Sequence, residues 1–204
     1  MTAPADANQT LFSQVNDLAR HTPWLHGLAT GYAEYGVVLF AALVLLAVWQ
    51  GRHAPHAKLA AALWAGVATV LAVGVNQPVV SLVAEPRPYQ SHPGILVLVA
   101  RSTDWSFPSD HSVMAGACAV GLLIFSRRLG AVAAVAALLM AATRVYVGAH
   151  YPLDVLVGLV LGAVVAGAGW LLLRKPLVLA VSRVRTITPL RAWCEPRPGI
   201  GAAS

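Results

Sequence analysis

The sequence predicts an all-α fold: a polytopic membrane helix bundle of about five transmembrane helices, preceded by an N-terminal interfacial amphipathic helix. The first observation is composition. Of the 204 residues 58% are hydrophobic and 11% are charged, and the mean hydropathy is +0.69, which is too apolar for a soluble domain of this size. The second is a series of apolar stretches, most of them long enough to cross a bilayer, separated by turns. The third is positive charge that gathers in alternate connections.

The N-terminal segment has the pattern of an interfacial helix. Over residues 8–20 the apolar side chains recur at spacings of three and four, which is the period of an amphipathic helix. Such a helix lies in the plane of the membrane surface. Trp24 and Tyr32 follow, at the depth where aromatic rings collect. The first transmembrane span therefore begins near Leu28 and ends at Trp49.

The second span is expected over residues 59–83, with a kink at Pro78 near its end. The segment from 84 to 107 follows, with three prolines and no long apolar stretch. Its apolar run, residues 95–100, is too short to cross a membrane. We expect this run either to dip into the interface or to cover a site.

Three further apolar stretches complete the predicted bundle: residues 112–125, 129–147 and 153–173. Gly158 and Gly162 lie four positions apart in the last of these stretches. This spacing favours close contact with another helix.

The connections between the five spans differ in charge. Those on one side, together with the C-terminal tail, carry ten Lys and Arg residues against the single acidic residue Glu195, whereas the other side carries four against seven. The two sides have net charges of +9 and −3, and the positive-inside rule places the basic side in the cytoplasm. We therefore divide the chain into a membrane-embedded domain, residues 1–175, and a basic cytoplasmic tail, residues 176–204. No basic stretch interleaved with aromatic residues indicates nucleic acid as a partner.

The first candidate site is the turn formed by Pro108, Ser109, Asp110 and His111, directly before an apolar helix. Ser109 occupies the N-cap position, so the free N–H groups after it and the positive end of the helix dipole form an anion site. His111 lies in the first turn beside them. The same residues would also suit an ordinary helix cap with a surface histidine, and the motif alone does not separate the two.

The second candidate group combines Arg144 with His150 and Asp154. Pro152 suits the first helical position, which makes Tyr151 the cap and puts Asp154 in the first turn, within reach of the His150 ring. A carboxylate bonded to one ring nitrogen fixes the tautomer and leaves the other nitrogen free as a base or nucleophile. A structural role stays open, in which Asp154 only favours the helix dipole and Arg144 is a topological charge.

The third candidate is Arg87, which lies between Pro86 and Pro88. The two prolines restrict the backbone, so that the guanidinium is presented in a defined place. Its planar set of donors matches phosphate oxygens. Two arginines, a helix N-terminus, a histidine–aspartate pair and a second histidine on one membrane face together predict a site for phosphoryl transfer.

These three segments resemble the three signature motifs of the type 2 phosphatidic acid phosphatase superfamily of membrane lipid phosphatases. The likeness extends over residues 80–154. The Ser-Phe-Pro-Ser-Asp-His form of the second motif has Asp110 where many members carry glycine. This form, and the N-terminal amphipathic helix, resemble the bacitracin-resistance type of undecaprenyl-diphosphate phosphatase. The resemblance implies that residues 1–175 form a lipid phosphatase domain.

The resemblance also implies a role for each candidate residue. His150 would attack the terminal phosphorus and form a phosphohistidine, Asp154 would orient His150, and His111 would protonate the leaving oxygen. The phosphoryl oxygens would be held by Arg87, Ser109, the amide of Asp110, and Arg144. No cofactor and no metal ion would be needed, and the sequence has no dense carboxylate cluster for Mg²⁺.

Two positions depart from the family pattern. Val80 stands where the first motif has a lysine, seven residues before Arg87, so one phosphate-holding charge is missing. Arg101 is a candidate replacement. Asp110 adds a negative charge beside the phosphate, which is unfavourable unless the carboxylate pairs with Arg87 or Arg101.

The lipid substrate expected from this resemblance is undecaprenyl diphosphate, hydrolysed during cell wall (peptidoglycan) biogenesis at the periplasmic or exterior face of the bacterial cytoplasmic membrane. Phosphatidylglycerol phosphate, phosphatidate and other polyprenyl phosphates stay open, because tail-binding and lipid-facing apolar residues look alike in a sequence. A non-catalytic lipid-phosphate binder or transporter is a further alternative. The two histidines argue against it, since gripping a headgroup needs no nucleophile. The sequence does not predict the oligomeric state.

Overall fold

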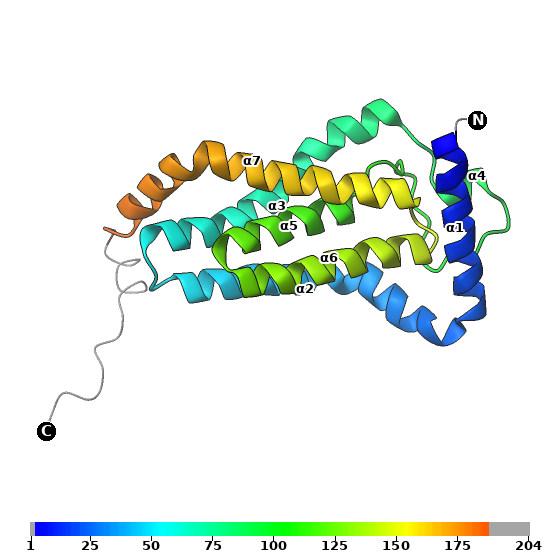
Figure 1. Ribbon diagram of the computed structural model, residues 1–204, viewed down its shortest axis with the longest axis horizontal. Helices are drawn as coiled ribbons and strands as arrows, with labels where there is room; N and C mark the ends of the chain where they lie inside the picture. Colours follow the sequence, from blue (N-terminus) through cyan, green and yellow to red (C-terminus); the bar gives the residue numbers. More distant parts are fainter. Residues whose placement is uncertain (1–2, 188–204) are drawn as a thin grey trace, which may run out of the picture.

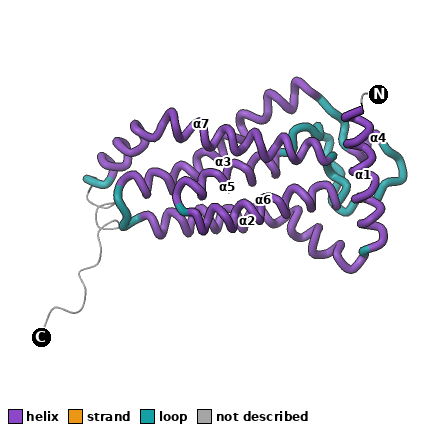
Figure 2. Tube along the Cα trace, viewed as in Figure 1, coloured by secondary structure: helices purple, strands orange, loops and turns teal. Residues whose placement is uncertain are grey.

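The computed structural model describes residues 3–187 and contains helices and loops, without a strand in that range (Figures 1 and 2). Its helices are α1 (Ala3–His21), η1 (Pro23–Leu25), α2 (His26–Gly51), α3 (His56–Val83), α4 (Pro88–Ser91), α5 (Asp110–Phe125), α6 (Arg127–Tyr146) and α7 (Pro152–Val184). Helices α2, α3, α6 and α7 are each long and apolar enough to cross a membrane, and α5 is a shorter apolar helix. The predicted all-α membrane bundle with an additional N-terminal helix is confirmed.

Helix α5 is the centre of the bundle, because it packs against α2, α3, α6 and α7. Small residues bring α7 especially close to it. A Cβ added at Gly162 would lie 2.0 Å from the carbonyl oxygen of Val113, and one at Gly158 would lie 2.8 Å from that of Ser109. The two helices therefore touch backbone to backbone, as the glycine spacing predicted.

The predicted transmembrane spans agree with the helices to within three residues, except at the end of α7. The fifth span was expected to end at residue 173, whereas α7 continues through Pro176 to Val184. Leu177 and Val181 pack in one apolar cluster with Leu59 of α3, so tertiary burial outweighs the helix-breaking tendency of proline. The predicted division after residue 175 consequently falls inside a helix, and residues 188–204 of the predicted tail lie outside the described part of the chain.

The two ends of the bundle are built differently (Figure 1). One end holds the α2–α3 turn, the α5–α6 turn and the end of α7, where Arg185 donates to the carbonyl oxygens of Arg52 and Ala54 at 2.7 and 2.8 Å. The other end holds α1, the long connection over residues 84–109 and the turn over residues 147–151. The basic turns thus lie together at one end, and the candidate site segments lie together at the opposite end.

Helix α1 lies across the end that holds the site segments (Figure 2). Its Asn16, 3% exposed, donates to the carbonyl oxygen of Leu96 at 2.8 Å and accepts from the Leu96 N–H at 3.0 Å. These bonds fix the apolar run 95–100 beneath α1. Val99 and Ala100 line the cavity described below, so the run covers a cavity, which is one of the two roles expected for it.

Candidate active site

A cavity of about 550 Å³ lies between α3, α5, α6 and the connection over residues 84–109. Among the predicted site residues, those that line it are Arg87, Asp110, His111, Arg144 and His150. Ser109 and Asp154 are fully buried next to these lining residues. The structure thus brings two histidines that are 39 positions apart in the sequence to one cavity.

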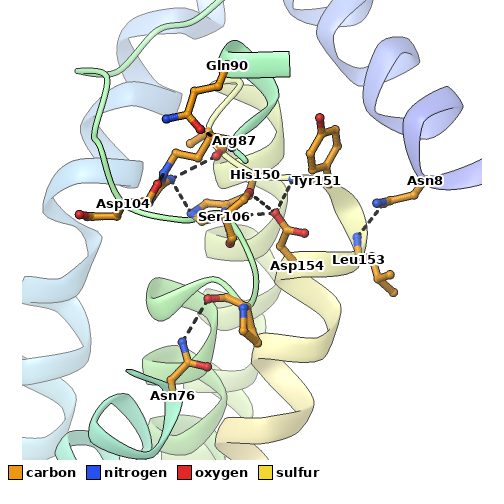
Figure 3. Close-up of polar contacts among 12 residues, drawn as sticks. Asn8, Asn76, Arg87, Gln90, Asp104, Ser106, His150, Tyr151, Leu153 and Asp154 are labelled. Carbon is orange, nitrogen blue, oxygen red and sulfur yellow. Dashed lines mark hydrogen bonds and ion pairs between the residues drawn. The ribbon is translucent and has the colours of Figure 1, made fainter. Parts of the chain in front are cut away.

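His150 is 2% exposed, and its two ring nitrogens face different partners (Figure 3). Nδ1 lies 2.9 Å from the carbonyl oxygen of Ser106 and 3.5 Å from Oδ2 of Asp154. Because both neighbours are acceptors, Nδ1 carries the proton. Nε2 lies 3.1 Å from Nη1 of Arg87, and accepting from this guanidinium requires a lone pair on Nε2. Both contacts select the same tautomer, in which Nε2 is the candidate nucleophile.

Burial also keeps this imidazole uncharged. Removal from water lowers the pKa of His150 to about 4, and the positive charges of Arg144 and Arg87 act in the same direction, while Asp154 opposes them. At neutral pH the ring therefore carries no added proton. An unprotonated Nε2 is the form that nucleophilic attack requires.

Asp154 is held by a backbone amide and by a serine that the sequence analysis did not single out. Oδ2 of Asp154 accepts from the N–H of Tyr151 at 2.9 Å and from the hydroxyl of Ser106. Tyr151 is the N-cap of α7 and Pro152 is its first residue, as predicted. Ser106 contacts both members of the pair, His150 through its carbonyl and Asp154 through its hydroxyl (Figure 3). Its place at the start of the Ser-Phe-Pro-Ser-Asp-His motif was the signal available in the sequence.

A tight turn brings Arg144 and His150 together. The carbonyl oxygen of Arg144 accepts from the N–H groups of Ala149 at 3.1 Å and His150 at 3.3 Å. Gly148 within this turn has a φ of +79°, and a Cβ there would lie 2.5 Å from the carbonyl oxygen of Leu96. Glycine satisfies both the positive φ and the close approach.

The two arginines have only neutral partners for their guanidinium groups. Arg87 donates to the carbonyl oxygens of Asp104 and Ala149 at 3.0 and 3.2 Å, and Arg144 donates to that of Ala33 at 3.4 Å. The Nε of Arg144 is buried without a partner. Each residue is 8% exposed, and neither forms an ion pair with a carboxylate in residues 3–187. Two buried cations that lack a contacting carboxylate in residues 3–187 favour an anion in the cavity.

Ser109 begins α5 but does not act as an ordinary cap. Its hydroxyl makes no capping hydrogen bond and, although fully buried, has no partner, whereas a capping serine would accept from an N–H in the first turn. Its own N–H donates to the carbonyl oxygen of Asp154 at 3.2 Å. His111, half-buried, follows in the first turn of α5 and lines the cavity. The geometry of this turn favours the anion site over the ordinary helix cap.

Asp110 does not pair with either arginine that the sequence suggested. Its Oδ1 accepts from Asn76 at 2.7 Å and from Gln77 at 3.0 Å, both on α3. The guanidinium of Arg101 instead lies over the ring of Tyr89, 5.7 Å from its centroid, and Arg101 does not line the cavity. Sequence analysis missed the two amides, although adjacent polar residues inside an apolar span are a recognisable signal of function.

Val80 lines the cavity beside Ser81, so the position that departs from the family pattern does face the site. In the described part of the chain, the Lys and Arg residues that line the cavity are Arg87 and Arg144. Residues 3–187 contain no group of three or more His, Cys, Asp or Glu side chains placed to hold a metal ion. Independence from metal and cofactor stays a prediction.

The chain is similar in sequence to a family of known proteins. Residues 61–176, which include all the candidate residues, match the family model of the PAP2 superfamily. The undecaprenyl-diphosphatase BcrC of Bacillus subtilis (strain 168) is 31% identical over 182 residues, which cover 87% of this chain and 91% of that protein. The bacitracin transport permease protein BcrC of Bacillus licheniformis is 29% identical over 162 residues, covering 79% of this chain and 78% of that protein.

The fold has a solved counterpart. The crystal structure of a transmembrane PAP2 type phosphatidylglycerolphosphate phosphatase from Bacillus subtilis superposes with a TM-score of 0.62 at 23% identity, covering 87% of each chain. This similarity extends to the helix bundle as a whole. The family model spans more than half of the sequence, and the 31% identical relative is matched over nearly its whole length. The chain therefore belongs to the PAP2 superfamily.

Proposed function

We propose that this protein hydrolyses undecaprenyl diphosphate to undecaprenyl phosphate and inorganic phosphate, through a phosphohistidine at His150. The observation that carries the proposal is the pair of buried arginines without acidic partners beside an unprotonated Nε2. Such a site attracts a phosphate and presents a nucleophile to it. The relative from Bacillus subtilis named undecaprenyl-diphosphatase supports the choice of lipid.

In the first step the terminal phosphoryl group binds between Arg87 and Arg144 and supplies the missing negative charge. Arg87 exchanges its contact with Nε2 of His150 for a phosphoryl oxygen, which frees the lone pair. Nε2 attacks phosphorus as the bond to the bridging oxygen breaks, and that oxygen keeps the electron pair. His111 gives it a proton, so that undecaprenyl phosphate leaves. Asp154 offsets the positive charge that develops on the His150 ring.

Water completes the cycle. His111, now a base, takes a proton from a water molecule that attacks the phosphohistidine. The bond between phosphorus and nitrogen breaks, its electron pair returns to Nε2 of His150, and inorganic phosphate is released. No step of this sequence requires an electron donor or acceptor.

We place the reaction at the outer face of a bacterial cytoplasmic membrane. The cavity lies at the bundle end opposite the basic turns, and the positive-inside rule assigns those turns to the cytoplasm. A polyprenyl lipid can keep its tail in the bilayer while its diphosphate reaches a cavity at this depth. Such a lipid is released outside the membrane during wall assembly.

The proposal is tested by phosphate release from undecaprenyl diphosphate, measured on purified protein in detergent with a chelator present. We expect wild-type turnover in chelator and a loss of about 10³-fold or more in His150→Ala, because the nucleophile is removed. Phosphatidylglycerol phosphate and phosphatidate in the same assay compare the competing headgroups. Activity that persists in His150→Ala would refute the nucleophile, and a clear preference for a glycerolipid would refute the substrate.

A binding or transport function without hydrolysis is the second candidate, because a relative carries the name bacitracin transport permease protein. It predicts that wild-type protein binds the diphosphate and releases no phosphate. The hydrolytic proposal predicts instead that binding without release appears only in His150→Ala. The same protein preparations therefore separate the two functions.

A further inference from the structure

Asn76 is a polar residue that lies fully buried inside the apolar helix α3. Its Nδ2 donates two hydrogen bonds to the turn that starts α5, one to the carbonyl oxygen of Pro108 at 3.1 Å and one to Oδ1 of Asp110 at 2.7 Å (Figure 3 shows the first). These acceptors lie immediately before and after Ser109. Asn76 therefore brackets the serine whose buried hydroxyl is left without a partner.

We propose that Asn76 is a positioning residue for phosphoryl transfer, which acts by fixing the turn that presents Ser109 and the first N–H groups of α5 to the substrate. The inference rests on the proposed function and extends it to a residue outside the three motifs. Ser109 is held from a second side, because its N–H donates to the carbonyl oxygen of Asp154 on α7. The turn is thus fixed between α3 and α7, and Asn76 supplies the α3 side.

The same amide also holds the carboxylate of Asp110. Asn76 and Gln77 both donate to Oδ1, which fixes this oxygen toward α3. An unrestrained aspartate in the first turn could turn its negative charge toward a bound phosphate, and like charges at close range repel. The contact with Asp110 thus limits a repulsion that glycine at this position would not create.

Burying the amide group of Asn76 in an apolar helix costs free energy, and its hydrogen bonds to the turn before His111 offset part of that cost. Asn76 is buried in a helix whose other buried residues are apolar, and its Oδ1 has no partner. A polar group buried in this way is unfavourable unless its hydrogen bonds are made. Both hydrogen atoms of its amide group are used on one turn, the turn that precedes His111.

The test is a kinetic comparison of Asn76→Leu and Asn76→Ala with wild type, on whichever lipid phosphate the wild-type protein hydrolyses. Leucine keeps the volume and suits a membrane helix, so it removes the two donors with little loss of packing. We expect kcat to fall by about 10- to 100-fold, because a misplaced phosphate-holding group costs rates of this order. The fall in kcat/KM should be similar, since the lost contacts matter most in the transition state.

Thr69→Ala is the matched control, because Thr69 is a polar residue of α3 whose hydroxyl donates to its own helix at Ala65. It should retain wild-type kcat. Normal kcat in correctly folded Asn76→Leu and Asn76→Ala would overturn the positioning role. If neither variant folds, Asn76→Asp keeps the shape while removing the donors, and normal kcat in that variant would overturn the role equally.

A double-mutant cycle separates positioning from simple stability. Asp110→Gly removes one of the two acceptors, so Asn76→Leu should cost less in that background than in wild type, by a factor of several. A residual cost is expected from the lost bond to Pro108. Equal costs in both backgrounds would refute the link through Asp110. Failure of wild-type protein to hydrolyse any lipid phosphate would instead refute the proposed function, which the same assay shows first.

Discussion

Three polar groups around one imidazole decide how His150 can react. The Ser106 carbonyl and the Asp154 carboxylate hold the proton on Nδ1, while Arg87 donates to Nε2. The nearer acceptor for Nδ1 is the backbone carbonyl at 2.9 Å, with the carboxylate at 3.5 Å. Two groups therefore orient the His150 ring. The Ser106 carbonyl belongs to the backbone and stays in place in side-chain variants, whereas the Asp154 carboxylate can be removed by mutation.

Ser106→Ala tests how the carboxylate is held. The change removes the hydroxyl that donates to Asp154, a charge-assisted hydrogen bond worth about 1.5–3 kcal/mol. We expect kcat to fall by about 10-fold, and by more in Asp154→Ala, because the first variant keeps the Asp154 carboxylate beside His150 and the second removes it. Ser13→Ala, whose hydroxyl bonds only within α1, is the control. Equal losses in Ser106→Ala and Asp154→Ala would contradict this division of roles.

The pH profile follows from the lowered pKa of His150. Because burial lowers it to about 4, the neutral ring that the proposed attack requires predominates above that pH and is lost as the pH falls through it. We expect kcat/KM to be maintained from neutral pH down to about pH 5 and to fall below it as Nε2 of His150 gains a proton. Stopped assays of kcat/KM from pH 3 to 9 measure this acid limb. A profile that stays flat down to pH 3 would contradict attack by an unprotonated His150.

Helix packing places the site by means of small residues. Gly162 of α7 and Val113 of α5 approach so closely that a methyl group has no room, since the added Cβ would lie 2.0 Å from a backbone oxygen. This contact lies one turn below Ser109 and Gly158, where the same two helices bring Asp154 next to the start of α5. The distance between α5 and α7 therefore sets how close the Ser109 turn lies to Asp154.

Gly162→Ala should destabilise the protein by about 1–3 kcal/mol or more, because the added methyl forces the helices apart. Activity should fall with it, since the Ser109 turn moves relative to Asp154. Gly167→Ala in the same helix is the matched control, because its Cβ would meet a side chain at 3.8 Å, an ordinary contact. Thermal unfolding in detergent gives the comparison. Similar unfolding temperatures for the two variants would show that the contact is less strict than the structure indicates.

Hydrophobic length and charge were enough to predict the helices and the common end of the motifs. His111 and His150 both fall at ends of apolar stretches, and the two crossings that separate them, an even number, bring them to one side. The partners of Asp110 could not be predicted in this way. Whether Asn76 faces α5 depends on the rotation of α3 about its axis, and an apolar helix in lipid has little periodicity to fix that rotation. Likewise, the continuation of α7 beyond residue 173 could not be predicted, because Leu177 and Val181 pack against Leu59 of α3, which is distant in sequence.

On the scale of the whole molecule, helix lengths indicate the depth of the site. At 1.5 Å per residue, the 16 residues of α5 span about 24 Å, less than the roughly 30 Å of a hydrocarbon core. Arg127 and Arg128 lie at the opposite end of α5 from the cavity, and the proposed orientation puts that end at the cytoplasmic surface. Under the proposed orientation, the first turn of α5 then starts below the outer surface. The connection over residues 84–109 fills the space above it, which suits a phosphate attached to a tail that stays in the bilayer.

The orientation itself can be measured with single cysteines in a background in which Cys118 and Cys194 are replaced by alanine. Thr103→Cys lies in the exposed part of the connection beside the cavity, and Ala57→Cys lies exposed at the start of α3, at the basic end. We expect a membrane-impermeant maleimide added to intact cells to label only Thr103→Cys, and to label Ala57→Cys after the membrane is opened, because the net charges of +9 and −3 orient the basic end inward. Labelling in the opposite order would place the cavity in the cytoplasm. It would also remove the argument for a substrate released outside the membrane, since the phosphate would then have to be presented from within the cell.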